Sequence, residues 1–283
     1  MKIQWSDLAR WGAALRIVCF FSLLLLLWLP IALLYWLISG QSPNIACLIA
    51  LYLEFFVLSW VWGRRLHGLS YPFYHYGLVW APELGVDLVK AMVFGLGGVI
   101  SLYLIQTSLG WISLQPPASD FPIILLQGLG VALVVGLAEE FLFRGWLLFE
   151  LERDYSPELA LWISSLLFAL AHYLRPIAVI FETWPQFFGL VLLGMALVWA
   201  KRSPSAYLDR KASGKLGAPI GLHAGLVWGY YLFTVGQLVR YSPQIPEWLT
   251  GIDQNPLAGV LGFALLGVIA AFFQRKSRRS ATL

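Results

Sequence analysis

Three ionisable residues interrupt an apolar stretch in the middle of the chain. Glu139, Glu140 and Arg144 lie within "VGLAEEFLFRGWLL", and His172 and His223 lie in the apolar segments "SSLLFALAHYL" and "PIGLHAGLVWGYY". A charged side chain at the centre of a bilayer costs about 2.5–3.5 kcal/mol on insertion scales, so such residues usually carry a function. A glutamate and a histidine at one depth can hold and deprotonate a water molecule, which is the chemistry needed for hydrolysis.

The spacing of the charged residues assigns them different roles. Adjacent residues on a helix point about 100° apart, so Glu139 and Glu140 face different surroundings. Glu140 and Arg144 are four residues apart, which favours an ion pair on one helix face, either purely structural or orienting the site. Glu139 is then left without a local cation and is the candidate general base. His223 can polarise a carbonyl or stabilise its oxyanion.

A metal site is the alternative use of the same side chains. Glu139, His172 and His223 together resemble a His₂Glu zinc set, which leaves a fourth position for water. The local HExxH spacing of soluble metalloproteases is absent from the chain. The cofactor is therefore left open, with zinc and a metal-free glutamate mechanism given equal weight.

Other polar and aromatic residues have weaker signals. Glu54, in "IALYLEFFVLSW", could serve the site, line a polar cavity or pair with Arg175. Phe168 precedes His172 by four residues and shares its helix face, where it could pack or form a wall of the substrate pocket. Two further histidines lie in the loop "RRLHGLSYPFYHYG" and are expected to be solvated or interfacial: His67 and His75.

Composition identifies the elements that must position these residues. The chain has 283 residues, of which 59% are hydrophobic and 12% charged, whereas soluble domains have about 25% charged residues. The mean hydropathy is +0.75, and 14 tryptophans are typical of a protein with many membrane–water interfaces. We therefore expect an all-α, polytopic membrane protein. The net charge of +4 bears on topology and does not indicate a nucleic-acid partner.

The apolar segments predict about eight transmembrane helices, because each is long enough, or nearly so, to cross the hydrocarbon core. With the N-terminus in the cytoplasm, all but two of the 19 basic residues fall in cytoplasmic segments, the exceptions being Arg175 and Arg240. Both termini are therefore expected in the cytoplasm. A polar cytoplasmic linker is expected at 201–219, and residues 1–283 are expected to form a single membrane domain. The expected spans are 17–38, 45–62, 86–109, 121–148, 158–174, 186–200, 217–239 and 256–273.

The order of these motifs resembles the CPBP family of intramembrane proteases, which includes the CAAX prenyl endopeptidases. The resemblance rests on Glu139-Glu140-x-x-x-Arg144, then Phe168-x-x-x-His172, then a further helix with His223, and it covers residues 85–240, the expected catalytic core. It implies that Glu139 activates a water that His172 helps to bind. It also implies that Glu140 and Arg144 support the helix and that His223 belongs to the oxyanion site.

One position departs from the family pattern. The family usually has Asn or Asp four residues after the last histidine, where this chain has Val227. Valine cannot donate a hydrogen bond, and the loss of an oxyanion donor typically lowers the rate by about 10²–10³. Trp228, Tyr230 or a backbone N–H group could take its place.

Three functions follow from these features. The first is an intramembrane endopeptidase of the plasma membrane or an internal membrane, acting on a membrane-associated protein or peptide, either prenylated of the CAAX type or not. The second is a non-catalytic membrane partner or immunity protein on the same scaffold, which Val227 favours. The third is a transporter or proton relay, against which the chain has no recognisable inverted repeat. The first is the leading hypothesis.

Overall fold

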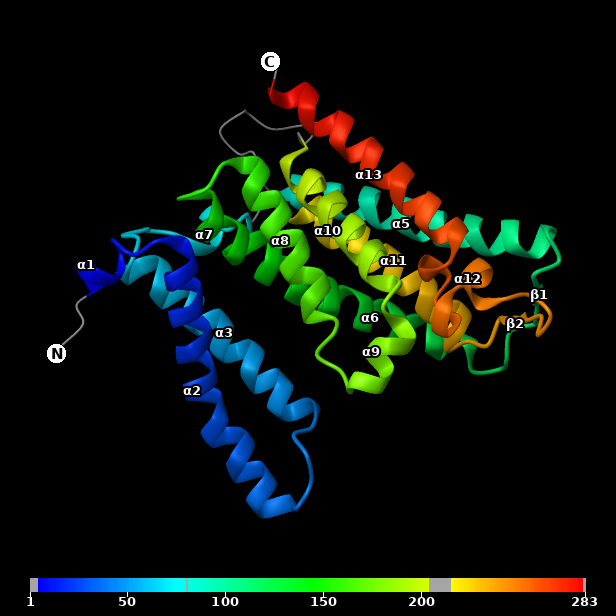
Figure 1. Cartoon of the computed structure of the whole chain (residues 1–283), viewed down its shortest axis with the longest axis horizontal. Helices are drawn as coiled ribbons and strands as arrows, with labels where there is room; N and C mark the ends of the chain where they lie inside the picture. Colours follow the sequence, from blue (N-terminus) through cyan, green and yellow to red (C-terminus); the bar gives the residue numbers. More distant parts are fainter. Residues whose placement is uncertain (1–4, 80, 204–214, 282–283) are drawn as a thin grey trace.

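The computed structural model describes residues 5–79, 81–203 and 215–281, and this part of the chain is mostly helical (Figure 1). This confirms the all-α class. The helices are α1 (Trp5–Leu8), α2 (Ala13–Ser39), α3 (Ile45–Arg65), α4 (Pro72–His75), α5 (Pro82–Ser108), α6 (Phe121–Glu140), the π-helix η1 (Phe141–Leu147), α7 (Leu148–Glu152), α8 (Pro157–Ala171), α9 (Ile177–Thr183), α10 (Gln186–Arg202), α11 (Gly217–Thr234), α12 (Glu247–Thr250), the 3₁₀ turns η3 (Ile252–Gln254) and η4 (Pro256–Ala258), and α13 (Val260–Ala281).

Not all of these helices are long enough to cross a bilayer. Within the described residues, five pass a test of length and hydropathy: α2, α3, α5, the α6–α7 segment and α13. A sixth arises if α9 and α10, which bend by 78° at a short break, count as one span. The apolar helix α8 has only 15 residues, which is short for about 30 Å of hydrocarbon. The count of eight spans and the orientation of the termini therefore remain predictions.

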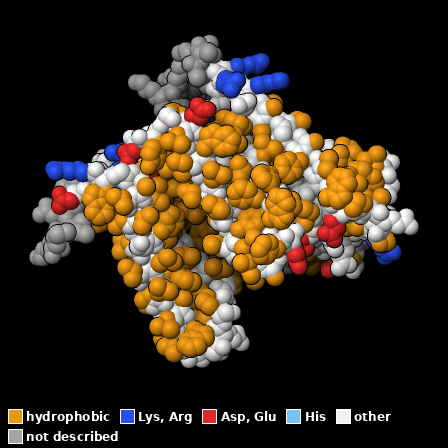
Figure 2. All heavy atoms as spheres, in the orientation of Figure 1, with side chains coloured by type: hydrophobic (Ala, Val, Ile, Leu, Met, Phe, Trp, Pro, Cys, Tyr) orange, Lys and Arg blue, Asp and Glu red, His pale blue; other side chains and the backbone are white. Residues whose placement is uncertain are grey.

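The surface is that of a membrane protein. Hydrophobic side chains cover most of the face drawn in Figure 2, while the charged groups gather near its margins. Leu26, Val134 and Phe181 are 66%, 68% and 73% exposed, which would be unfavourable in water over so continuous an area. Together with the long apolar helices, this surface identifies an integral membrane protein.

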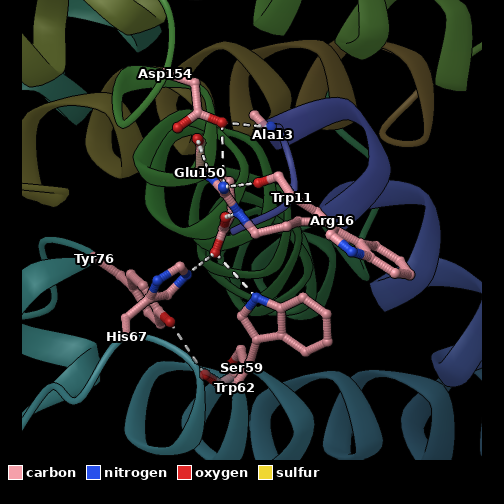
Figure 3. A network of polar contacts seen from close by, with 9 residues as sticks. All are labelled: Trp11, Ala13, Arg16, Ser59, Trp62, His67, Tyr76, Glu150 and Asp154. Atoms are coloured by element: carbon pink, nitrogen blue, oxygen red, sulfur yellow. Dashed lines mark hydrogen bonds and ion pairs between the residues drawn. The ribbon is translucent and has the colours of Figure 1, made fainter. Parts of the chain in front are cut away.

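The α2–α3 hairpin diverges from the rest of the molecule and is attached at one end (Figure 1). Its anchor is the fully buried carboxylate of Glu150 in α7 (Figure 3). The Glu150 carboxylate accepts hydrogen bonds from Arg16 Nε at 2.9 Å and Trp62 Nε1 at 3.0 Å, and it lies 2.5 Å from His67 Nε2. Arg16 also pairs with Asp154 at 3.1 Å. The cluster joins α2, α3 and the loop after α3 to α7.

The expectation that His67 is solvated or interfacial is wrong. Its side chain is only 1% exposed in this cluster, whereas the sequence predicts a solvated or interfacial histidine. The polar linker predicted at 201–219 lies largely outside the described residues, which omit 204–214.

The remaining helices form the body that carries the candidate site. Helix α11 packs against α5 and α6, and α10 packs against α8 and α13. Glycine permits one of these contacts: a Cβ atom at Gly136 would lie 3.1 Å from the carbonyl oxygen of Ile220. The short strands β1 (Ile112–Leu114) and β2 (Val239–Tyr241) pair antiparallel at one end of the body. The close approach of α6 and α11 brings Glu139 and His223 together.

Candidate active site

A break in helix geometry follows directly after the paired glutamates. The sequence predicts one continuous helix over 121–148, but α6 ends at Glu140 and continues as the π-helix η1 before α7 begins. A π-helix contains an extra residue per turn and occurs mostly as a short bulge, frequently at functional sites. Glu139 and Glu140 therefore lie on the last turn of a regular helix, and Arg144 lies within the wide turn.

Glu139 faces both histidines. Its Oε2 atom lies 3.8 Å from His172 Nε2 and 4.0 Å from His223 Nε2. The Glu139 side chain is 23% exposed, and Oε2 has no hydrogen-bond partner among the described residues. The structure thus brings together three residues that are far apart in the sequence.

Glu140 has a separate set of partners, as its different helix face predicts. Its Oε1 atom accepts hydrogen bonds from Arg144 Nη1 at 3.0 Å and His223 Nδ1 at 2.8 Å. Both side chains of the Glu140–Arg144 pair are fully buried, and Arg144 Nη2 also donates to the Gly194 carbonyl at 3.2 Å. The ion pair expected from the spacing is confirmed. Glu140 fixes the His223 ring with Nε2 directed toward Glu139.

Phe168 supports the second histidine through its backbone and its ring. The Phe168 carbonyl lies 2.9 Å from His172 Nδ1, and because a carbonyl can only accept, Nδ1 carries the proton and donates. The Nε2 atom of neutral His172 is then an acceptor on the side of Glu139. The Phe168 ring lies 4.2 Å from the Arg144 guanidinium carbon, within the range of a cation–π contact.

The spacing of these atoms fits a water molecule better than a zinc ion. Zinc binds nitrogen and oxygen at about 2.0–2.2 Å, so a tetrahedral site brings ligand atoms within about 3.4 Å of each other. The separations from Glu139 Oε2 are 3.8 and 4.0 Å. Among the described residues, no group of three His, Cys, Asp or Glu side chains has the arrangement of a metal site. A water bonded to both partners at about 2.8 Å fits the observed distances.

Val227 remains the position at which this chain lacks the hydrogen-bond donor that is usual in the family. Val227 lies one helical turn after His223 on α11. Trp228, one of the donors considered as a substitute, bonds instead to the Leu125 carbonyl at 3.1 Å.

The Glu54 Oε2 atom is buried without a hydrogen-bond partner in the described part of the chain. Among the described residues Glu54 forms no ion pair with Arg175, which was one of the three alternatives for this residue.

The fold and site define a helical membrane protein with a glutamate in α6, a histidine at the C-terminal end of α8 and a second histidine in α11. The family of Rce1-like type II CAAX prenyl endopeptidases matches residues 121–229, the segment that holds all of these residues. This confirms the resemblance to the CPBP family and indicates a hydrolase of the protease class. Comparisons with curated proteins and with solved structures found no match.

Proposed function

We propose that this protein is an intramembrane endopeptidase in which Glu139 activates a water molecule directly. The observation that supports this proposal is the convergence of His172 Nε2 and His223 Nε2 on Glu139 Oε2, at 3.8 and 4.0 Å. Such a gap accommodates one water hydrogen-bonded to a base and an acceptor. A carboxylate with no other partner is available to take its proton.

The reaction follows from these positions. Glu139 removes a proton from the water, which His172 orients, and the hydroxide oxygen attacks the carbonyl carbon of the peptide bond. The negative charge that develops on the carbonyl oxygen is stabilised by His223 in its imidazolium form, in which Nδ1 donates to Glu140 and Nε2 donates to the oxyanion. The C–N bond then breaks, and Glu139 returns its proton to the leaving amine. Glu140 holds His223 in place, and Arg144 balances the charge of Glu140.

The substrate class follows from the surroundings of the site. The helices that carry Glu139 and the histidines are surrounded by apolar side chains, so the substrate is a membrane-associated protein or peptide. The match to a CAAX prenyl endopeptidase family supports a lipidated C-terminal segment as the first substrate to test. The partners that we propose are this substrate and the lipid bilayer, with no nucleic acid. We place both termini in the cytoplasm because nearly all basic residues lie in segments on one side of the membrane, together with the termini, and basic residues concentrate in cytoplasmic segments.

The test is cleavage by the full-length protein purified in detergent. Membrane peptides, including C-terminally prenylated ones, are incubated with the wild type and with Glu139→Gln, and the products are identified by mass spectrometry. We expect defined cleavage by the wild type and none by the variant. The matched control is Glu158→Gln, an exposed glutamate in the first turn of α8, which should cleave like the wild type. Equal cleavage by Glu139→Gln would contradict the assignment.

A non-catalytic membrane partner is the second candidate, favoured by one feature. Val227 supplies no donor at the position next to His223, and the neighbouring Trp228 is engaged with Leu125. If the folded wild type cleaves none of the peptides, this second function is the better account of the chain.

A further inference from the structure

The bonding pattern of the π-helix η1 implies that one of its carbonyls lacks a backbone donor. The Leu148 N–H group is shared between the Phe143 carbonyl, five residues back, and the Gly145 carbonyl, three residues back, and α7 begins at Leu148. In a π-helix each N–H group bonds to the carbonyl five residues earlier, and in an α-helix to the carbonyl four residues earlier. At the change from the first pattern to the second, one carbonyl receives no backbone N–H. That carbonyl belongs to Arg144, the residue that pairs with Glu140.

Side chains from two other helices bind the carbonyls of this turn. Lys201 of α10 is 6% exposed, and its Nζ donates to the Arg144 carbonyl. Ser164 of α8 is fully buried, and its Oγ donates to the Phe143 carbonyl at 3.2 Å. A buried carbonyl without a donor is costly, so these contacts favour the wide turn over a regular one.

The packing of α8 on α10 permits both contacts at once. A Cβ atom at Gly194 would lie 2.9 Å from both Cα and Cβ of Ser165, closer than real Cβ atoms approach. Only a glycine allows this approach of the two helices. The same glycine offers its carbonyl to Arg144 Nη2 at 3.2 Å. Lys201 and Gly194 therefore hold the backbone and the side chain of Arg144 from one helix.

We propose that Lys201, assisted by Ser164, is a positioning residue that maintains η1 and so aligns the chain of contacts from Arg144 through Glu140 to His223. If η1 relaxed to a regular α-helix, the residues after it would rotate by about 100° and move about 1.5 Å relative to α6. Arg144 would keep an i, i+4 relation to Glu140, but its Nη2 would move away from the Gly194 carbonyl of α10, and the contact of Glu140 with the His223 ring would lose this support. The catalytic part of this proposal rests on the proposed protease function.

The test combines a structural and a kinetic measurement on Lys201→Met. The chain has four histidines, so selective labelling of histidine ring nitrogens gives few NMR signals, and loss of one in His223→Asn assigns it. We expect Lys201→Met to shift the His223 signal and leave that of His67 in place. It should also lower kcat roughly tenfold to a hundredfold with KM unchanged. Lys201→Arg, which keeps a donor, should restore both. Arg202→Met removes the neighbouring cation and should change neither.

The outcomes separate the two proposals. An unchanged His223 signal in folded Lys201→Met would overturn the positioning role, whatever the activity. If this variant does not fold, Ser164→Ala decides: a smaller shift of the His223 signal supports the proposal, and no shift overturns it. A wild type that cleaves no peptide contradicts the protease function, and the His223 signal still decides whether Lys201 positions the ring.

Discussion

Glu139 and Glu140 are neighbours in the chain with different surroundings. Glu140 is fully buried between Arg144 and His223, whereas Glu139 is partly exposed and its Oε2 atom has no partner in the described residues. Removal of a buried carboxylate that holds two partners leaves a buried charge uncompensated and is destabilising, while a partly exposed carboxylate outside such a network is available for chemistry. The two residues should therefore respond differently to the same substitution.

The first prediction compares these two glutamates. Glu140→Gln leaves the buried Arg144 charge without its anion, so we expect the free energy of unfolding to fall by about 3–5 kcal/mol. Glu139→Gln should leave the stability unchanged or slightly higher while abolishing cleavage. Thermal unfolding in detergent measures both variants against the wild type. Equal loss of stability in the two variants would contradict the separation of their roles.

The second prediction concerns Val227, one turn after His223. An amide at this position can donate a hydrogen bond to the developing oxyanion, and one such donor is typically worth about 10²–10³ in kcat. Val227→Asn should therefore raise kcat by at least roughly tenfold, since the gain depends on how well the new donor is aligned. Val227→Leu, which adds no donor, is the control. A slower Val227→Asn enzyme with normal folding would place the oxyanion away from this turn of α11.

At the scale of elements, one continuous segment connects the site to the α2–α3 hairpin. It begins with Glu139 and Glu140 at the end of α6, passes through η1, and reaches Glu150 in α7. Glu150 holds Arg16 of α2 and Trp62 of α3 (Figure 3). The hairpin is therefore anchored to the same segment that positions the candidate base.

The third prediction tests this anchor. Glu150→Gln removes the anion from a buried cluster that includes Arg16, so we expect a loss of about 3–5 kcal/mol in the free energy of unfolding. The control is Glu152→Gln, which breaks the partly exposed pair with Arg202 and should cost less than about 1 kcal/mol. Denaturant or thermal unfolding of both variants decides. Similar stabilities for the two would show that the hairpin does not depend on Glu150.

For the whole molecule, the fourth prediction concerns orientation in the membrane. In a variant with Cys19 and Cys47 replaced by serine, single cysteines are introduced at Ser242, after β2, and at Ser277, near the end of α13. We expect Ser277→Cys to react with an impermeant thiol reagent only from the cytoplasmic side, and Ser242→Cys only from the opposite side. Reaction of both from one side would contradict the orientation drawn from the basic residues.

The residues of the candidate site could be predicted from the sequence because ionisable side chains are rare in apolar helices. Glu139, His172 and His223 are ionisable groups in apolar helices, and few such positions occur in the chain. The i, i+4 spacing also predicted the Glu140–Arg144 pair correctly. These inferences depend on local sequence patterns, which can be recognised without knowledge of the tertiary contacts.

The missed features depend on contacts between distant residues. An extra residue in a turn leaves the apolar pattern of a helix nearly unchanged, so η1 has no recognisable signature in the sequence. Lys201 and His67 lie next to basic, polar segments typical of a surface. Their burial becomes evident only when the Arg144 carbonyl and the Glu150 carboxylate are located.

The most direct measurement of the central claim is peptide cleavage before and after removal of metal, with the zinc content of the same samples. If Glu139 activates water by itself, as separations of 3.8 and 4.0 Å from the two histidines favour, protein treated with a chelator should keep its kcat. It should also contain far less than one zinc per chain. Loss of activity together with one zinc per chain, and recovery of both when zinc is returned, would contradict the account.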